Sequence, residues 1–149
     1  MHSLLVAMTL ATAPTPLVHD VAIDRGAVPL TLRYEADVAI EHRQVGSVAP
    51  GGRPDTLRCH WTASAEVRRT LVRQGQAAEP RLALESAGRL EPLSGHRPGW
   101  CDANRAAIAE AVEAGIPALR TRLAALAERD RATLASEIDD ATALFRTGG

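Results

Sequence analysis

The feature that most constrains the fold is a long alternation of apolar and polar residues that changes phase across one loop. Apolar residues occupy the even positions from Leu30 to Ile40 and then the odd positions from Leu57 to Val67. A period of two is typical of strands with one buried and one solvated face. The segment between them, residues 49–55, holds two prolines and two glycines and is predicted to be the connecting loop. We therefore predict a long central hairpin.

The phase change also restricts how the two strands pair. Directly paired residues of antiparallel strands point to the same face of the sheet. Even apolar positions before the loop must therefore lie opposite odd apolar positions after it. The two residue numbers of every pair are expected to sum to an odd value.

Two weaker segments extend the predicted sheet, and a third is predicted to lie outside regular structure. Leu17 to Ile23 alternates in the same way and ends at Asp24-Arg25-Gly26, a turn-forming sequence. A shorter strand is predicted from Arg81 to Glu85. The stretch from Gly88 to Trp100 is rich in glycine and proline, and we predict it to be irregular.

The C-terminal third of the chain changes to helical spacing. Asp102 is the predicted N-cap of a helix, which Gly115-Ile116-Pro117 is expected to interrupt. Pro117 then suits the first turn of a second helical segment that reaches Phe145. The predicted fold class is α+β: an antiparallel sheet of about four strands, covered on one face by a C-terminal helical segment broken near Pro117.

Residues 1–13 have the composition of a signal peptide or apolar leader. The apolar run from Leu4 to Leu10 precedes Ala11-Thr12-Ala13, which matches a small-x-small cleavage site. Against export stand the lack of Arg or Lys before the run and the proline that would follow cleavage. The alternative is an ordinary buried strand. We predict a leader over 1–13 and one α+β domain over 14–149, which is β-rich over 17–100 and helical over 102–146.

The chain has only two cysteines, Cys59 and Cys101. An even cysteine count behind a leader-like segment indicates a disulfide in an exported protein. Strand parity places Cys59 on the buried face, and Cys101 directly precedes the predicted helix. A redox pair is the alternative, but the Cys-x-x-Cys spacing is lacking. We predict a disulfide that joins the sheet to the helical layer and a periplasmic or secreted location.

Composition narrows the classes of partner. Seventeen basic residues balance eighteen acidic ones, so the net charge is −1. The sequence also lacks the stripe of basic residues that is typical of a nucleic-acid-binding protein. No run approaches the roughly 18 apolar residues of a spanning helix, so no integral membrane segment is expected. Phosphate-binding, dinucleotide-binding and hydrolase motifs are absent from the sequence, so it predicts no cofactor.

One set of residues raises the question of a metal site: Cys59, His60, His96 and Cys101. Adjacent residues of a strand project to opposite faces, so Cys59 and His60 do not converge on one tetrahedral ion. No metal ligands are therefore assigned.

Two regions are candidate binding sites. The segment before the helix gathers His96, Arg97 and Trp100, although Trp100 is also expected to close the edge of the core. The polar face of the hairpin carries Glu41 and His60, which is also what an ordinary solvated face contains.

Function is predicted only as a class. We predict a small exported, disulfide-stapled protein that works by binding or as a structural component, with a protein or a small anionic ligand as its partner. One alternative is a small hydrolase that uses His96 or His60 as general base. Another is an envelope protein that self-associates through the C-terminal helix. No catalytic residue is assigned.

Overall fold

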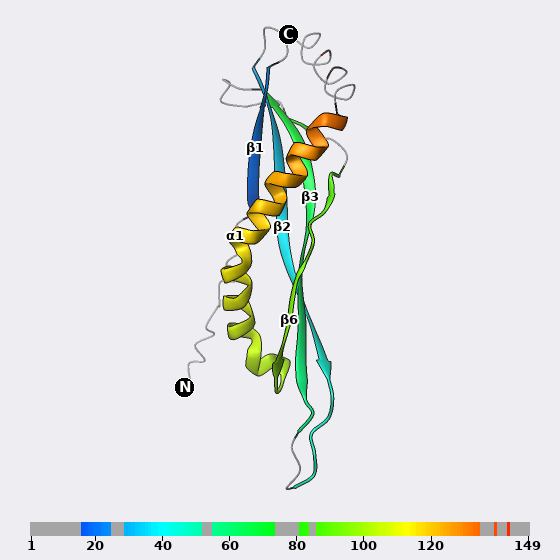
Figure 1. The fold of residues 1–149 in the computed structure, drawn as a ribbon, viewed down its shortest axis with the longest axis vertical. Helices are drawn as coiled ribbons and strands as arrows, with labels where there is room; N and C mark the ends of the chain where they lie inside the picture. The colour runs from blue at the N-terminus through cyan, green and yellow to red at the C-terminus, as the bar shows by residue number, and fades with distance from the viewer. Residues whose placement is uncertain are drawn as a thin grey trace, which may run out of the picture.

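The computed structural model of the chain describes residues 16–24, 29–51, 55–73, 81–83, 86–134, 139 and 143. In this part of the chain an antiparallel sheet is covered on one face by a long helix (Figure 1). The predicted α+β fold is therefore confirmed. The predicted leader and the end of the predicted helix towards Phe145 lie outside the described residues.

A long hairpin forms the centre of the sheet. Its strands, β2 (Leu30–Val45) and β3 (Arg58–Arg73), have 16 residues each. Leu30 pairs with Arg73 and Val45 with Arg58, and the residue numbers of every pair sum to 103. The odd sum confirms the predicted register rule. At about 3.3 Å per residue each strand spans about 50 Å, which gives the molecule its elongated shape.

Shorter strands border the hairpin on both sides. Strand β1 (Leu17–Ile23) is the strand predicted over these residues, and it pairs with β2. On the side away from β2, strand β3 pairs with three short strands at successive positions along its length. They are β4 (Arg81–Ala83), β5 (Gly88–Arg89) and β6 (Leu93–Pro98). Strand β1 therefore lies beside the half of the hairpin away from its loop, and β6 lies beside the half near the loop.

Strand β6 corrects the prediction that the stretch from Gly88 to Trp100 is irregular. Its residues pair with β3 from Leu93 opposite Ala63 to Pro98 opposite Arg58. Proline and glycine weaken a central strand. An edge strand tolerates them because the backbone N–H groups on its open side form no hydrogen bonds to another strand. The composition of this stretch therefore concealed a strand.

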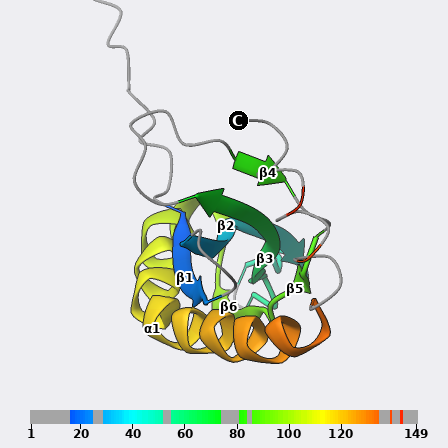
Figure 2. The ribbon, with the colours of Figure 1, turned by 90° about the horizontal axis from the view of Figure 1, so that it is seen from above.

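Helix α1 (Cys101–Thr133) runs without interruption through Pro117, so the predicted break at Pro117 is wrong. A proline inside a helix removes one backbone hydrogen bond and commonly bends the helix. Leu119 and Leu123, just beyond it, are almost completely buried and fix the helix against the sheet on that side. The helix changes direction partway along its length (Figure 1) and curves around one side of the strands (Figure 2).

The N-cap of the helix lies two residues earlier than predicted, and the capping side chain comes from strand β2. Trp100 occupies the N-cap position without a side-chain hydrogen bond, and Asp102 instead lies in the first turn beside Arg105. The backbone N–H of Cys101 donates to Oε1 of Gln44 at 2.8 Å. The Gln44 amide donates in turn to the carbonyl of Gly99 at 3.2 Å. A side chain of β2 therefore replaces the predicted Asp102 cap.

The predicted disulfide is present and lies at this junction. Cys59 and Cys101 are bonded, with their Cα atoms 4.8 Å apart. Cys59 is fully buried, in a cluster with Ala63 of β3 and with Ile108 and Val112 of α1. The bridge therefore ties the first turn of the helix to the central strand of the sheet.

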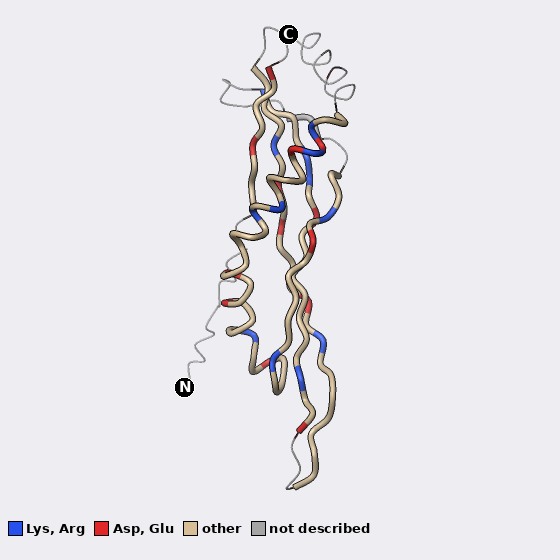
Figure 3. The backbone as a smooth tube through the Cα atoms, viewed as in Figure 1, with Lys and Arg blue, Asp and Glu red and all other residues tan. Residues whose placement is uncertain are grey.

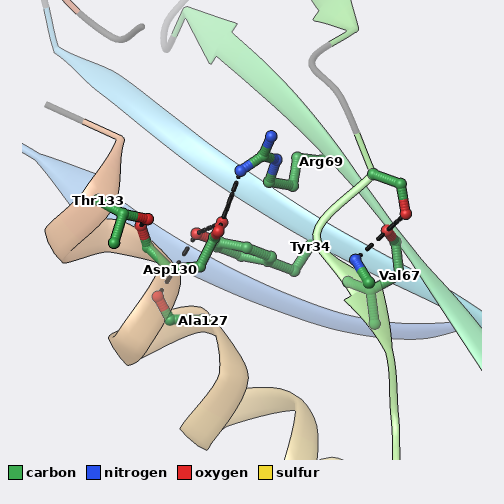
Figure 4. A network of polar contacts seen from close by, with 8 residues as sticks. Tyr34, Val67, Arg69, Ala127, Asp130 and Thr133 are labelled. Atoms are coloured by element: carbon green, nitrogen blue, oxygen red, sulfur yellow. Dashed lines mark hydrogen bonds and ion pairs between the residues drawn. The ribbon is translucent and has the colours of Figure 1, made fainter. Parts of the chain in front are cut away.

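A second connection between helix and sheet is polar and buried (Figure 4). Arg69 donates from one guanidinium nitrogen to both carboxylate oxygens of Asp130, at 3.0 Å each. The hydroxyl of Tyr34 donates to Asp130 at 3.0 Å, and the carbonyl of Ala127 lies 3.4 Å from the same hydroxyl. Tyr34 and Arg69 are directly paired across the hairpin, so both side chains reach the carboxylate from the same face.

Tyr34 makes a pH prediction possible. Burial, followed by the hydrogen bond to Asp130, raises the pKa of the Tyr34 phenol above its ordinary value. The unfolded chain loses this proton near pH 10 while the folded chain keeps it, so stability is complete below about pH 10 and falls as the pH rises further. Because Tyr34 is the only tyrosine, phenolate absorbance reports it alone. We expect the folded protein to titrate at higher pH than the protein in guanidinium, and coincident titrations would contradict the network.

Candidate functional site

The register brings the two candidate binding regions together on one face. We call the face opposite α1 the outer face. On β3, odd positions such as Cys59 and Ala63 are buried under the helix, so His60 points to the outer face. His60 is paired with Arg43 on one side and with His96 on the other. The three side chains therefore form one row across β2, β3 and β6, which we call the basic row.

The basic row lies in an open hollow of about 610 Å³. The rings of His60 and His96 are stacked, with centroids 5.7 Å apart and planes 30° from parallel. Glu41, Thr62 and Ser94 form the neighbouring row, because Thr62 pairs with both Glu41 and Ser94. The hollow is lined by Glu41, His42, Arg43, His60, Trp61, Thr62, Ser94, Gly95 and His96.

The outer face is basic near the hairpin loop and mixed in charge further away. Arg58 occupies the row next to the basic row on the side of the hairpin loop, opposite Val45 and Pro98. The first acidic side chain of the strands away from the loop is Glu41, and beyond it a second hollow of about 560 Å³ is lined by both acidic and basic residues, among them Asp37, Glu66, Arg68 and Arg89. Blue and red segments are accordingly mixed along the part of the hairpin strands away from the loop (Figure 3).

The predicted site residues divide between different surfaces. The structure brings Glu41, His60 and His96 into the hollow. Arg97 is paired with the buried Cys59, so it lies on the helix side of β6 and apart from His96. Trp100 is 56% exposed, and the interpretation that it closes the edge of the core is wrong.

Trp61 has the packing role that was expected of Trp100. It is partly buried and packs against the cluster around Cys59 and Ile108. A Cβ atom built on Gly95 would lie 2.8 Å from two carbons of the Trp61 indole. Glycine at position 95 therefore lets the indole lie directly against β6, beneath the hollow.

This contact gives a direct prediction. Gly95→Ala should displace the Trp61 ring and lower the free energy of unfolding by about 1–3 kcal/mol, the usual cost of overpacking. Chemical denaturation monitored by indole fluorescence measures it. Gly51→Ala is the matched control, because a Cβ there meets no atom within 4 Å. Equal stabilities of the two variants would show that Trp61 does not lie against Gly95.

The hollow has groups for binding but no assembled acid-base pair. Within the described residues neither His60 nor His96 forms a side-chain hydrogen bond to a carboxylate or a hydroxyl. A general base is ordinarily oriented by such a partner. The disulfide uses the sulfurs of both cysteines in the Cys-His set that raised the question of a metal site. The described residues contain no group of three or more His, Cys, Asp or Glu placed to hold a metal ion.

Two contributions were not identified from the sequence. Arg43 is one of several charged residues on the polar face of the hairpin, and its position opposite His60 depends on the register. The sequence pattern does single out Arg69, because it is a charged residue at an odd, apolar-face position of β3, between Val67 and Leu71. A buried charge needs a partner, and Asp130 supplies it.

The chain matches no protein-family model, no curated protein and no solved structure. Among the described residues, no helix has the length and apolar character that crossing a membrane requires.

Proposed function

We propose that this is an exported, disulfide-stapled binding protein and that its ligand-binding surface is the hollow around the basic row. The observation that carries the proposal is the convergence of Arg43, His60 and His96 in that hollow. Within the described residues none of these three side chains forms a side-chain hydrogen bond or an ion pair with the protein. Their charges and donors are therefore available to a ligand.

Two other ion pairs of the described residues have evident structural roles. The buried Arg69 and the partly buried Asp130 join helix to sheet, and Arg33 and Asp20 join β1 to β2 with the Arg33 Nε 2.8 Å from the carboxylate. The basic row holds no such pair of elements together. A ligand-binding role accounts for its placement better than a structural one.

Export is supported by the disulfide and by the leader-like sequence together. A buried bridge that ties the helix to the sheet suits an oxidising compartment. The residues that precede Pro14 match a cleavage site. N-terminal sequencing of the protein recovered from a periplasmic fraction tests this part of the proposal, and we expect the mature chain to begin at Pro14.

Binding is tested by a ligand panel on the oxidised protein. The panel should contain organic acids, sugar phosphates, amines and short peptides, and the thermal midpoint should be measured for the wild type and for His60→Ala/His96→Ala. We expect at least one ligand to raise the midpoint of the wild type and not that of the variant. Arg89→Ala, in the second hollow, is the control and should respond like the wild type. A panel whose ligands act equally on all three proteins would refute the site.

The hydrolase alternative has a weaker basis. It needs His96 or His60 to be oriented by a carboxylate or paired with a nucleophile. Glu41 and Ser94 lie in the neighbouring row rather than hydrogen-bonded to either imidazole. The geometry therefore favours binding.

A further inference from the structure

We propose that the basic row binds an oxyanion group, a carboxylate or a phosphate, between the guanidinium of Arg43 and the imidazoles of His60 and His96. This inference rests on the proposed function and names the chemistry of its ligand. The row contains one guanidinium and two imidazoles, and it contains no carboxylate. An arginine fork matches the two oxygens of such a group with parallel N–H donors.

The neighbouring rows define where the anion lies. Arg58 adds a second guanidinium on the side of the hairpin loop, while Glu41 lies on the other side, so the charge changes sign within two residues of β2. An anion is attracted towards Arg43 and repelled from Glu41. Thr62 and Ser94, in the row of Glu41, offer hydroxyl donors that tolerate either charge.

The stacked histidines present two imidazoles to one ligand group. Their ring centroids are 5.7 Å apart, so an oxyanion beside one ring also lies near the other. The charged groups that face the pair are Arg43, Arg58 and Glu41. The guanidinium of Arg43 provides the attraction for an anion, and the two imidazoles provide further ring nitrogens for hydrogen bonds.

The size of the hollow indicates that the oxyanion is one part of a larger ligand. A volume of about 610 Å³ lies within the range of small-molecule sites. An acetate or phosphate ion fills only a fraction of it. A metal ion is a poorer occupant, because Arg43 and Arg58 repel a cation beside the two imidazoles.

The test is an NMR titration of the oxidised full chain with two probes, sodium phosphate and sodium acetate, at constant ionic strength set by chloride. We expect saturable shifts of the imidazole signals of His60 and His96 with at least one probe. Arg43→Gln should weaken that binding about tenfold. The probe that binds more tightly distinguishes a phosphate source from a carboxylate source.

Arg89→Gln is the matched control, because it removes a guanidinium from the second hollow and should leave the titration unchanged. Shifts that never saturate, or that are the same in Arg43→Gln, would overturn the proposal. So would a response to Zn²⁺ with none to phosphate or acetate. If neither anion binds while a panel ligand still depends on His60 and His96, the oxyanion assignment is wrong and the proposed binding function stands.

Discussion

Cys101→Ala is expected to lower the free energy of unfolding by about 4 kcal/mol. The bridge closes a loop with a sequence separation of 42 residues, and the entropy that such a loop loses in the unfolded chain corresponds to about this value. The variant leaves Cys59 as a small buried thiol, so the packing at that position changes little. Guanidinium denaturation of the oxidised wild type and of the variant measures the difference.

Reduction of the wild type provides the matching control. The reduced protein should unfold at the same denaturant concentration as Cys101→Ala, since both lack the cross-link and keep Gln44 to cap the helix. A loss below about 1 kcal/mol in both would show that the bridge does not hold the helix to the sheet.

Asp130→Ala is expected to lower the free energy of unfolding by about 3–5 kcal/mol, the usual effect of breaking a buried ion pair. The side chain of Arg69 is 6% exposed and would lose both carboxylate oxygens, and the hydroxyl of Tyr34 would lose the closer of its two acceptors. Urea denaturation monitored by circular dichroism gives the value.

Two further variants separate the burial of the pair from its charge. Arg69→Met/Asp130→Leu replaces both partners by apolar groups and should be more stable than Asp130→Ala. Asp37→Asn is the control: it removes the carboxylate that contacts Arg68, the residue before Arg69 on β3. The side chain of Arg68 is 63% exposed and that of Asp37 is 55% exposed. That control should change stability by less than about 1 kcal/mol. Similar losses in Asp37→Asn and Asp130→Ala would contradict the buried network.

The hairpin could be predicted from the sequence because its strands are buried on one face, and this burial produces the alternation of apolar and polar residues. Leu32, Tyr34 and Leu71 are almost completely buried and mark the apolar phase on both hairpin strands. Parity alone limits the pair sum to odd values, and the value of 103 depends on the loop and on packing against α1. Pro117 and β6 were mispredicted because tertiary packing and an edge position compensate for weak local preferences.

The candidate site was only partly accessible to sequence reasoning. Glu41, His60 and His96 were selected, but in two separate regions, since nothing local indicates that β6 pairs with β3. A shift of one residue in that pairing would send His96 to the helix side of the sheet. Trp100 was misjudged because the local sequence does not reveal that Trp61 already covers this part of the core.

The central claim is that the chain places Arg43, His60 and His96 in one row of the outer face. Cross-strand nuclear Overhauser effects between backbone protons test it without any ligand. We predict contacts that pair His60 with His96 across β3 and β6, and His60 with Arg43 across β3 and β2. Contacts that instead pair His60 with Arg97 would place His96 on the opposite face and contradict the site.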